Sequence, residues 1–353
     1  MAKIIITGAG SAQSNGVINC LLMDNDNNEV IGLGSDIYDL MLCKAHKKIL
    51  IPHSTCPNYK EKLLKVLNEE KADMIHFQHD KELYMALQFK KDIEKTGTKM
   101  LVPDFNTVDI CVHKYQSWKK FKEYGIKVPN NLVINTELDL KNAFKELGNK
   151  DGTIWLRSID IGGGGKGSLA VSDFDMAKDW IDRSTGWGNF VAAELLTSKT
   201  VTWLSIWYNG QLIVAQGRRR FSWAHSALSL SGVTGVTKVG ETYSDKLVDE
   251  IAQSACKAVS DIPHGIYGVD MAYDNNDIPN PTEINISRFF TTVEFFAQVG
   301  LNMPVILKDL CIYGKYPKLD KVCNPLKNGY LWIRGMDVLP RLTTQEEMRE
   351  EIK

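Results

Sequence analysis

The chain has 353 residues, of which 24% are charged and 44% hydrophobic, as in an ordinary soluble globular protein. At about 150 residues per domain, this length predicts two or three domains. The 42 basic and 43 acidic side chains leave a net charge of −1, which argues against a nucleic-acid-binding surface over the whole molecule. No apolar run approaches the roughly 18 residues of a membrane span, and we expect no signal peptide. With seven scattered cysteines, these features predict a cytoplasmic protein with reduced thiols and no membrane partner.

The first hundred residues alternate strand-like and helix-like patterns. Five short apolar runs predict strands, at residues 3–7, 29–33, 48–51, 72–77 and 99–102. Helical spacing of apolar residues predicts helices between them, at 15–23, 59–70 and 82–94. Repeated β-α-β units of this length predict a parallel, doubly wound, Rossmann-like sheet with helices on both faces. We expect this domain to cover residues 1–104.

Glycines after the first strand suggest a dinucleotide cofactor. Gly8 and Gly10 follow that strand, and Asp36 ends the second one. The dinucleotide fingerprint needs a third glycine three residues further on, and Gln13 stands at that position. A tight turn whose backbone amides face a small ligand at the carboxyl edge of the sheet is therefore favoured over nicotinamide binding.

A mixed pattern of helices and alternating strands follows residue 104. Helical spacing occurs at 113–124, 138–147, 174–184 and 244–260. Strand-like patterns occur at 153–157, 168–171, 190–196, 200–208, 211–216, 265–273, 282–285 and 330–336. Asn209-Gly210, between two of these strands, is a strong signal for a hairpin turn. The order predicts an α+β region after the parallel sheet.

Two elements of this region are suited to binding the phosphates of a nucleotide. Lys114 lies just inside the first of these helices. Arg157 ends a strand that leads to a glycine loop made of Gly162, Gly163, Gly164, Gly165 and Lys166. Consecutive glycines expose backbone N–H groups and let the chain fold over phosphates. The loop differs from a Walker loop, because Gly167 and not serine or threonine follows the lysine.

Two further elements are suited to an adenine base and a metal ion. Glu194-Leu195-Leu196 ends an apolar strand, where backbone groups can contact an adenine edge. Glu283 and Asn285 alternate along one strand, so both oxygens project from one face, where Asp270 on a neighbouring strand can meet them. Mg²⁺ prefers such oxygen ligands while it keeps waters and substrate phosphates. Arg288 would supply positive charge to a phosphoryl group.

This ordered set of motifs resembles the ATP-grasp superfamily, and the resemblance covers nearly the whole chain. It implies a pre-ATP-grasp domain at 1–104, followed by an ATP-grasp domain of two α+β lobes at 105–308. The lid lobe would span about 114–190 and the C-terminal lobe about 191–308. A C-terminal extension at 309–353 would contribute a strand that completes the fold.

The resemblance also implies a role for each motif. Lys114 and Arg157 would contact the phosphates under the glycine loop. An arginine at the second of these positions resembles the carbamoyl phosphate synthetase branch of the superfamily. The segment ending at Leu196 would be the adenine hinge, and the three oxygen ligands would hold Mg²⁺, or Mn²⁺ in its place. The family motif usually runs Glu-x-Asn-x-Arg, and Ser287 moves Arg288 one position further. The acidic residue that usually holds the ribose is replaced by Val201 and its flanking threonines.

A run of three arginines, Arg218-Arg219-Arg220, follows a predicted strand. A charge run is usually a solvated surface. In an ATP-grasp enzyme, however, this segment belongs to the lobe with the acceptor site. The resemblance therefore implies that Arg218 or Arg220 pairs with a substrate carboxylate or with the transferred phosphate.

Taken together, the resemblance implies an ATP-dependent carboxylate–amine ligase. Such an enzyme forms an amide bond through an acyl phosphate and releases ADP and phosphate. Its partners would be a small-molecule carboxylate and amine, without nucleic acid, and homodimers are common among such enzymes. The alternatives are an ATP-grasp kinase, a carboxylating or carbamoyl-phosphate-type enzyme, and a non-catalytic nucleotide-binding regulatory protein.

Overall fold

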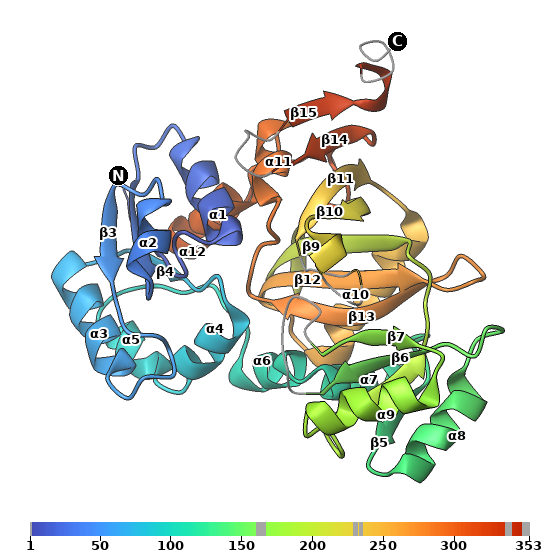
Figure 1. The fold of residues 1–353 in the computed structure, drawn as a ribbon. Coiled ribbons are helices and arrows are strands. Elements are labelled where there is room, and N and C mark those ends of the chain that lie inside the picture. The colour runs from blue at the N-terminus through green and yellow to red at the C-terminus, as the bar shows by residue number, and fades with distance from the viewer. Residues whose placement is uncertain (1, 160–166, 229–231, 233–235, 336–340, 348–353) are drawn as a thin grey trace.

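The computed structural model describes residues 2–159, 167–228, 232, 236–335 and 341–347. Its strands form one parallel sheet and two antiparallel sheets (Figure 1). The parallel sheet lies at the blue N-terminal end, and the two antiparallel sheets lie beside it. This is the combination of α/β and α+β architecture that the sequence predicts.

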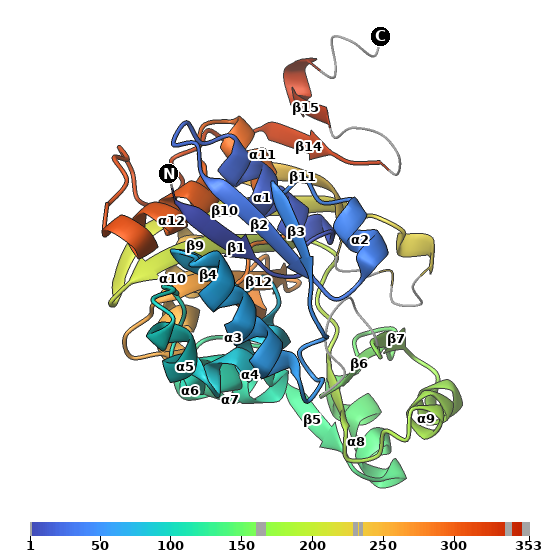
Figure 2. The ribbon, with the colours of Figure 1, turned by 90° about the vertical axis from the view of Figure 1, so that its left-hand side faces the viewer.

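The first sheet has four parallel strands in the order β3-β2-β1-β4, seen side by side in Figure 2: β1 (Lys3–Ile6), β2 (Glu29–Gly34), β3 (Lys47–Leu50) and β4 (Met74–His76). One face packs against α1 (Ala12–Leu22) and α12 (Met303–Tyr313). The other packs against α3 (Tyr59–Glu70), α4 (Asp80–Leu87) and α5 (Lys90–Lys95). The strand order reverses between β1 and β4, and ligands of such sheets bind at the carboxyl ends beside this point.

Two element predictions for this domain are wrong. Residues 99–102 do not form a fifth strand, because Lys99 makes only an isolated bridge with Met74. The helix expected over 82–94 is two helices, α4 and α5, since the helical conformation is interrupted after Gln88. The remaining strands and helices of this region lie close to the predicted ranges.

The candidate dinucleotide residues serve the local fold. Asp36 caps α2 (Ile37–Met41), and its side chain accepts hydrogen bonds from the backbone N–H groups of Tyr38 and Asp39. A Cβ atom on Gly10 would lie 2.1 Å from the carbonyl oxygen of Asp39. Gly10 and Asp36 therefore pack the first glycine turn against α2.

The second sheet is antiparallel, in the order β5-β8-β6-β7, and forms a small lobe with two helices: β5 (Asn131–Ile134), α8 (Glu137–Leu147), β6 (Ile154–Ser158), β7 (Leu169–Val171), α9 (Phe174–Arg183) and β8 (Phe190–Glu194). The lobe has its own hydrophobic core. α6 (Phe105–Val112) and α7 (Lys114–Glu123) lead from the first sheet to this lobe. α8 begins with a capping box formed by Thr136 and Asp139.

The third sheet is the largest, in the order β13-β12-β9-β10-β11-β14-β15: β9 (Thr200–Tyr208), β10 (Gln211–Trp223), β11 (Thr237–Tyr243), β12 (Gly265–Tyr273), β13 (Pro279–Ile286), β14 (Tyr330–Ile333) and β15 (Arg341–Thr344). A 3₁₀ turn, Ser226–Leu228, follows β10. α10 (Lys246–Val259) packs on one face of the sheet. The hairpin predicted at Asn209-Gly210 is confirmed, and both residues have positive φ, as the favoured two-residue turn requires. β10 is longer than expected, so the three arginines lie within the strand and not after it.

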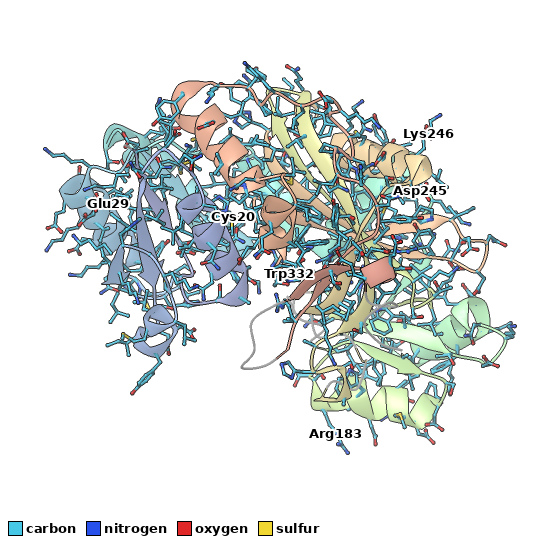
Figure 3. The ribbon with its side chains drawn as sticks, turned by 90° about the horizontal axis from the view of Figure 1, so that it is seen from above. Cys20, Glu29, Arg183, Asp245, Lys246 and Trp332 are labelled. Carbon is cyan, nitrogen blue, oxygen red and sulfur yellow. The ribbon has the colours of Figure 1, made fainter. Side chains whose placement is uncertain are left out.

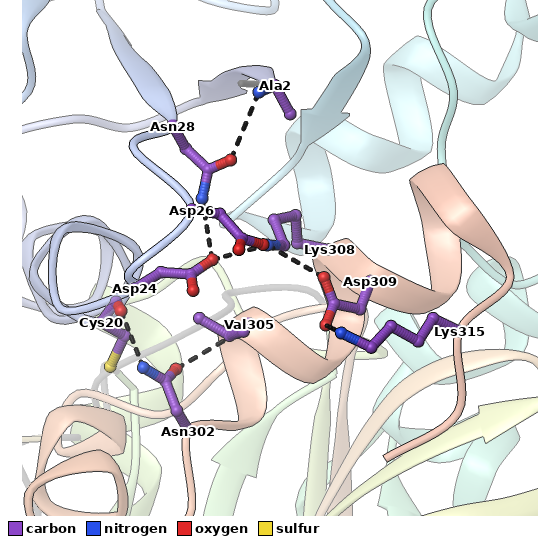
Figure 4. A network of polar contacts seen from close by, with 10 residues as sticks. All are labelled: Ala2, Cys20, Asp24, Asp26, Asn28, Asn302, Val305, Lys308, Asp309 and Lys315. Atoms are coloured by element: carbon purple, nitrogen blue, oxygen red, sulfur yellow. Dashed lines mark hydrogen bonds and ion pairs between the residues drawn. The ribbon is translucent and has the colours of Figure 1, made fainter.

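The chain returns to the first domain through α11 (Val293–Gln298) and α12. The fully buried Nζ of Lys308 on α12 lies 2.5 Å from Asp24, 2.7 Å from Asp26 and 2.9 Å from Asp309 (Figure 4). These contacts join α12 to the loop between α1 and β2. The boundary that we expect between the ATP-grasp domain and the C-terminal extension, after residue 308, falls inside α12. We therefore propose that the extension begins after this helix.

All seven cysteines are free, and Cys20, Cys43, Cys111 and Cys256 are buried. Cys20 lies on α1, on the side facing the C-terminal helices (Figure 3), and its carbonyl oxygen accepts a hydrogen bond from Asn302 at 2.8 Å. Among the described residues, no helix has the length and apolar character needed to cross a membrane.

Candidate active site

Three predicted site residues and one further residue, Thr202, stand opposite one another on four neighbouring strands of the large sheet. Glu283 of β13 stands opposite Asp270 of β12, Asp270 stands opposite Thr202 of β9, and Thr202 stands opposite Arg218 of β10. Directly opposed residues of neighbouring strands lie on the same face of a sheet. Asn285, two residues after Glu283, also lies on that face.

The structure brings the three proposed metal ligands together. Asn285 Nδ2 donates a hydrogen bond to Asp270 Oδ2 at 2.8 Å, and the Thr202 hydroxyl donates to Asp270 Oδ1. Within the described residues, no group of three His, Cys, Asp or Glu side chains could hold a metal ion. The set here consists of two carboxylates and one amide. Hard oxygen donors of this number fit Mg²⁺, which fills its remaining positions with waters and phosphate oxygens.

Glu283 is surrounded by cations. Lys114, the first residue of α7, forms a direct ion pair with its carboxylate. Burial raises the pKa of Glu283, but Lys114, Arg288 and Arg157 outweigh it and lower the pKa to about 2. Arg157 belongs to β6 of the small lobe, and its Nη1 lies 3.5 Å from the carbonyl oxygen of Thr282 on β13. The two proposed phosphate-binding cations therefore both lie beside β13, which carries two of the proposed metal ligands.

Arg288 lies just beyond that strand. Its Nη2 donates a hydrogen bond to Asn285 Oδ1, and its Nε lies 3.7 Å from Asp80 Oδ2. Asp80 is the first residue of α4, so this contact reaches from the first domain into the site. Ser287, the residue that departs from the family motif, has φ +54°.

Arg218 and Arg220 lie on β10 in different surroundings. Arg218 is 1% exposed, donates to Thr202 and Thr292 at 2.8 Å each, and lies 4.4 Å from the Phe290 ring centre. Burial lowers its pKa well below the usual range, and the charges of Arg220 and Arg334 act in the same direction. Its hydrogen bond to Thr202, which in turn donates to Asp270, fits a role in supporting Asp270, and its contact with substrate stays a prediction.

Arg220 is held by hydroxyls and an aromatic ring. It donates to Thr237 at 2.9 Å and Thr200 at 3.1 Å, and its guanidinium lies 3.6 Å from the Trp223 ring centre. Among the described residues, no carboxylate forms an ion pair with Arg218 or Arg220, whereas Arg219 pairs with Glu241. An incoming anion could compensate the charge of Arg220.

The expected adenine hinge joins the small lobe to the large sheet. The Glu194 carboxylate accepts hydrogen bonds from the backbone and side-chain amides of Asn130, at 2.9 and 3.2 Å. Leu195 and Leu196 follow directly, as half-buried residues between β8 and β9. The glycine loop residues Gly162, Gly163, Gly164, Gly165 and Lys166 lie outside the described residues.

Two site residues were not selected from the sequence. Thr202 links Asp270 to Arg218, but only the strand register reveals that it stands between them. Arg334 follows β14, donates to the Thr291 carbonyl oxygen at 2.7 Å and faces Arg218 closely enough to lower its pKa. A cation directly after a short apolar strand was the available signal for Arg334.

Comparisons with known proteins identify the fold. No protein-family model and no curated protein sequence matches the chain. Among solved structures, the chain is similar to biotin carboxylase from Campylobacter jejuni (TM-score 0.71, 15% identity, 94% of this chain and 75% of that one). It is also similar to N5-carboxyaminoimidazole synthetase from Staphylococcus aureus in complex with ADP (0.69, 15%, 99% and 86%). A third similar structure is L-amino acid ligase from Bacillus licheniformis (0.69, 11%, 99% and 85%).

These neighbours are ATP-grasp enzymes, and the chain has the ATP-grasp fold. The fold predicted from the ordered motifs is thereby confirmed. At identities of 11–15%, the likeness extends to the fold and not to a particular reaction.

Proposed function

We propose that the protein is an ATP-dependent carboxylate–amine ligase that forms an amide bond through an acyl phosphate. The observation that carries the proposal is the position of Asp270, Glu283 and Asn285 on one sheet face, directly beside Lys114 and Arg288. Oxygen ligands for a metal and cations for phosphates are the two requirements of phosphoryl transfer. The ligase and the carboxyaminoimidazole synthetase among the similar structures support ATP-dependent chemistry on this fold.

The proposed reaction has two steps. A carboxylate oxygen of the acid attacks the γ-phosphorus of ATP, a new P–O bond forms, and the bond to the bridging oxygen breaks to release ADP. The amine nitrogen then attacks the acyl carbon, the C–O bond to phosphate breaks, and the amine loses a proton as the amide forms. Both steps depend on in-line positioning and charge neutralisation more than on a side-chain nucleophile.

The chain's own residues would position and neutralise the reactants. Lys114 and Arg157 would contact the phosphates, and Arg288 would offset the charge that develops on the transferred group. Arg220, which has no carboxylate partner among the described residues, would bind the acid substrate. Asp270, Glu283 and Asn285 would hold Mg²⁺, or Mn²⁺ in its place, which would supply positive charge to the phosphates.

The two remaining motifs would enclose the nucleotide. Glu194-Leu195-Leu196 would contact the adenine edge through backbone groups. The glycine loop that ends at Lys166 would cover the phosphates and exclude water, so that the acyl phosphate reacts with the amine and is not hydrolysed.

A carboxylating reaction is the second candidate, because one similar structure is a biotin carboxylase and another a carboxyaminoimidazole synthetase. Bicarbonate would then take the place of the acid. A requirement for bicarbonate, with no response to other acids, would favour this candidate.

The test is nucleotide turnover with Mg²⁺ and pools of amino acids and small carboxylic acids, resolving ADP plus phosphate from AMP plus pyrophosphate. We expect ADP and phosphate with particular pools, and no turnover in a Glu283→Ala control. Formation of AMP would contradict the acyl-phosphate mechanism. We further propose that the protein is a cytoplasmic homodimer. Size-exclusion chromatography with light scattering would measure its mass in solution and so test for the dimer.

A further inference from the structure

We propose that Asp80, at the start of α4 in the first domain, is a positioning residue for Arg288. The inference rests on the function proposed above, in which Arg288 offsets the charge of the transferred phosphoryl group. It adds to that function a role for the first domain, which would hold a catalytic side chain in place. The contacts between the first domain and residues 287–294 carry it.

The chain leaves the metal-ligand strand through a strained residue. β13 ends at Ile286, and Ser287 has φ +54°, a left-handed conformation that residues with a Cβ atom adopt rarely. Ser287 is fully buried, and its backbone N–H donates to the carbonyl oxygen of Ile266 at 2.8 Å. Such a conformation persists where the surrounding contacts hold it in place. The extra residue of the motif therefore turns the chain out of the strand, and the next residues contact the first domain.

Gln78 fixes the residue directly after Arg288. Its Oε1 accepts a hydrogen bond from the Phe289 N–H at 3.1 Å, and its Nε2 donates to the Phe289 carbonyl oxygen at 2.9 Å. Both residues are 1% exposed. The His76 ring packs 5.5 Å from the Phe289 ring, and its Nε2 lies 2.7 Å from the same Gln78 oxygen. The backbone beside Arg288 is thus held by the carboxyl end of β4.

Asp80 acts on the guanidinium itself. Its Oδ1 accepts from the Lys81 N–H at 2.9 Å and lies 3.5 Å from His79 Nδ1, whereas its Oδ2 faces Arg288 Nε at 3.7 Å. Arg288 Nε is buried and makes no hydrogen bond among the described residues, so the charge of Asp80 compensates it. A guanidinium presents five donors in a rigid fork. Restraint at Nε by Asp80 and at Nη2 by Asn285 fixes its plane and leaves other donors for a phosphoryl oxygen.

The segment after Arg288 is also tied to the first domain. Asn19 of α1 donates a hydrogen bond to Glu294 of α11 at 2.8 Å. A Cβ atom on Gly16 would lie 3.5 Å from Val293, so α1 and α11 pack closely. The distance between Arg288 and the ligands on β13 therefore depends on how the first domain docks on the large sheet.

The first test replaces Asp80 by asparagine, which keeps the size of the side chain and removes its charge. We expect the kcat of Glu283-dependent ATP turnover to fall roughly 10- to 100-fold, with the KM for ATP within threefold of the unsubstituted value. Asp80→Glu should recover part of the loss. Asp92→Asn is the matched control, because Asp92 pairs with Lys60 and Lys95 on the surface of the same domain.

The second test needs no nucleotide. Phenylglyoxal modification of Arg288, followed by peptide mass spectrometry, reports how well its guanidinium is held. We expect the modification rate at Arg288 to rise several-fold in Asp80→Asn and to stay unchanged in Asp92→Asn.

The outcomes separate this inference from the proposed function. If the unsubstituted protein turns over no ATP with any pool, the proposed function fails, and the modification rates still decide whether Asp80 holds Arg288. An unchanged modification rate, or a kcat within twofold in an active enzyme, would overturn the positioning role. A parallel change of kcat and KM with a lower melting temperature would also overturn it, because that pattern belongs to a merely structural contact.

Discussion

Lys114 and Glu283 form a direct ion pair between the start of α7 and β13, so a proposed phosphate-binding cation and a proposed metal ligand neutralise each other. The surrounding cations keep the pKa of Glu283 at about 2, and its carboxylate is therefore ionised at neutral pH, as a metal ligand must be. Binding of Mg·ATP would exchange this pair for two new ones, between Lys114 and phosphate and between Glu283 and the metal ion. In this structure, the positive charge of Lys114 and the negative charge of Glu283 compensate each other.

Replacing Lys114 by methionine should weaken ATP binding. The loss of one charge-assisted contact predicts an increase in Kd of roughly 10- to 100-fold. Isothermal titration calorimetry with Mg·ATP measures it. Lys119→Met is the matched control on the same helix, because Lys119 is exposed over the Tyr115 ring. The Kd of this variant for Mg·ATP should stay within twofold of that of the unsubstituted protein. Equal affinities for the two variants would contradict the assigned role of Lys114.

Replacing Thr202 by valine should destabilise the fold. The hydroxyl donates to the half-buried Asp270 and accepts from the buried Arg218, and its removal leaves each of them with one partner fewer. We expect the free energy of unfolding to fall by about 1–3 kcal/mol, measured by urea denaturation. Thr202→Ser keeps the hydroxyl and should lose less. A serine variant as unstable as the valine variant would show that the methyl group, and not the hydrogen bonds, matters.

Replacing Lys308 by methionine should be more costly. The ammonium is fully buried among three carboxylates, and its removal leaves Asp24 and Asp26 without this cation where α12 meets the first domain, whereas Asp309 keeps its contact with Lys315 (Figure 4). Breaking such a buried pair predicts a loss of about 3–5 kcal/mol in the free energy of unfolding. Lys315, which is 71% exposed beside Asp309, is the control, and Lys315→Met should change stability by less than about 0.5 kcal/mol. Similar unfolding curves for both variants would refute this account of the network.

Acidification should destabilise the protein through His76. Burial lowers the pKa of His76 to about 4, against its usual 6.5, although its contact with Gln78 acts in the opposite direction. Between these values the unfolded chain binds a proton that the folded protein does not, so the free energy of unfolding falls as the pH falls from 6.5 towards 4, by about 3 kcal/mol in total. His76→Asn should flatten this slope in urea unfolding, whereas the exposed His225→Asn should not. An unchanged slope in His76→Asn would assign the acid sensitivity to other groups.

The sequence predicts those elements whose pattern is local. The helix Tyr59–Glu70 and the strands Thr200–Tyr208 and Gly265–Tyr273 have the bounds expected from helical spacing and from turn residues. α11 and α12 were not predicted, because both lie largely buried in the core beside the first sheet and lack a clear polar face. β10 was expected to end before its arginines, since a charge run suggests solvent, whereas the sheet and its neighbours enclose two of them.

In the candidate site, too, the contacts that follow from a local pattern could be predicted and the others could not. The proximity of Asp270 and Asn285 could be predicted, because residues alternate in direction along a strand and the two strands form a hairpin. The contact of Thr202 with Asp270 and that of Asp80 with Arg288 could not, because they join strands and domains that are distant in the chain. Strand register and domain docking decide such contacts, and neither leaves a local pattern in the sequence.

The most direct test of the acyl-phosphate mechanism is the fate of carboxylate oxygen. An acid substrate that supports ADP formation would be labelled with ¹⁸O in its carboxylate, and the released phosphate would be analysed by mass spectrometry. The account predicts that one ¹⁸O atom passes from each carboxylate to the phosphate, in step with amide formation, and that Glu283→Ala abolishes the transfer. Phosphate without ¹⁸O, formed while the amide accumulates, would contradict it.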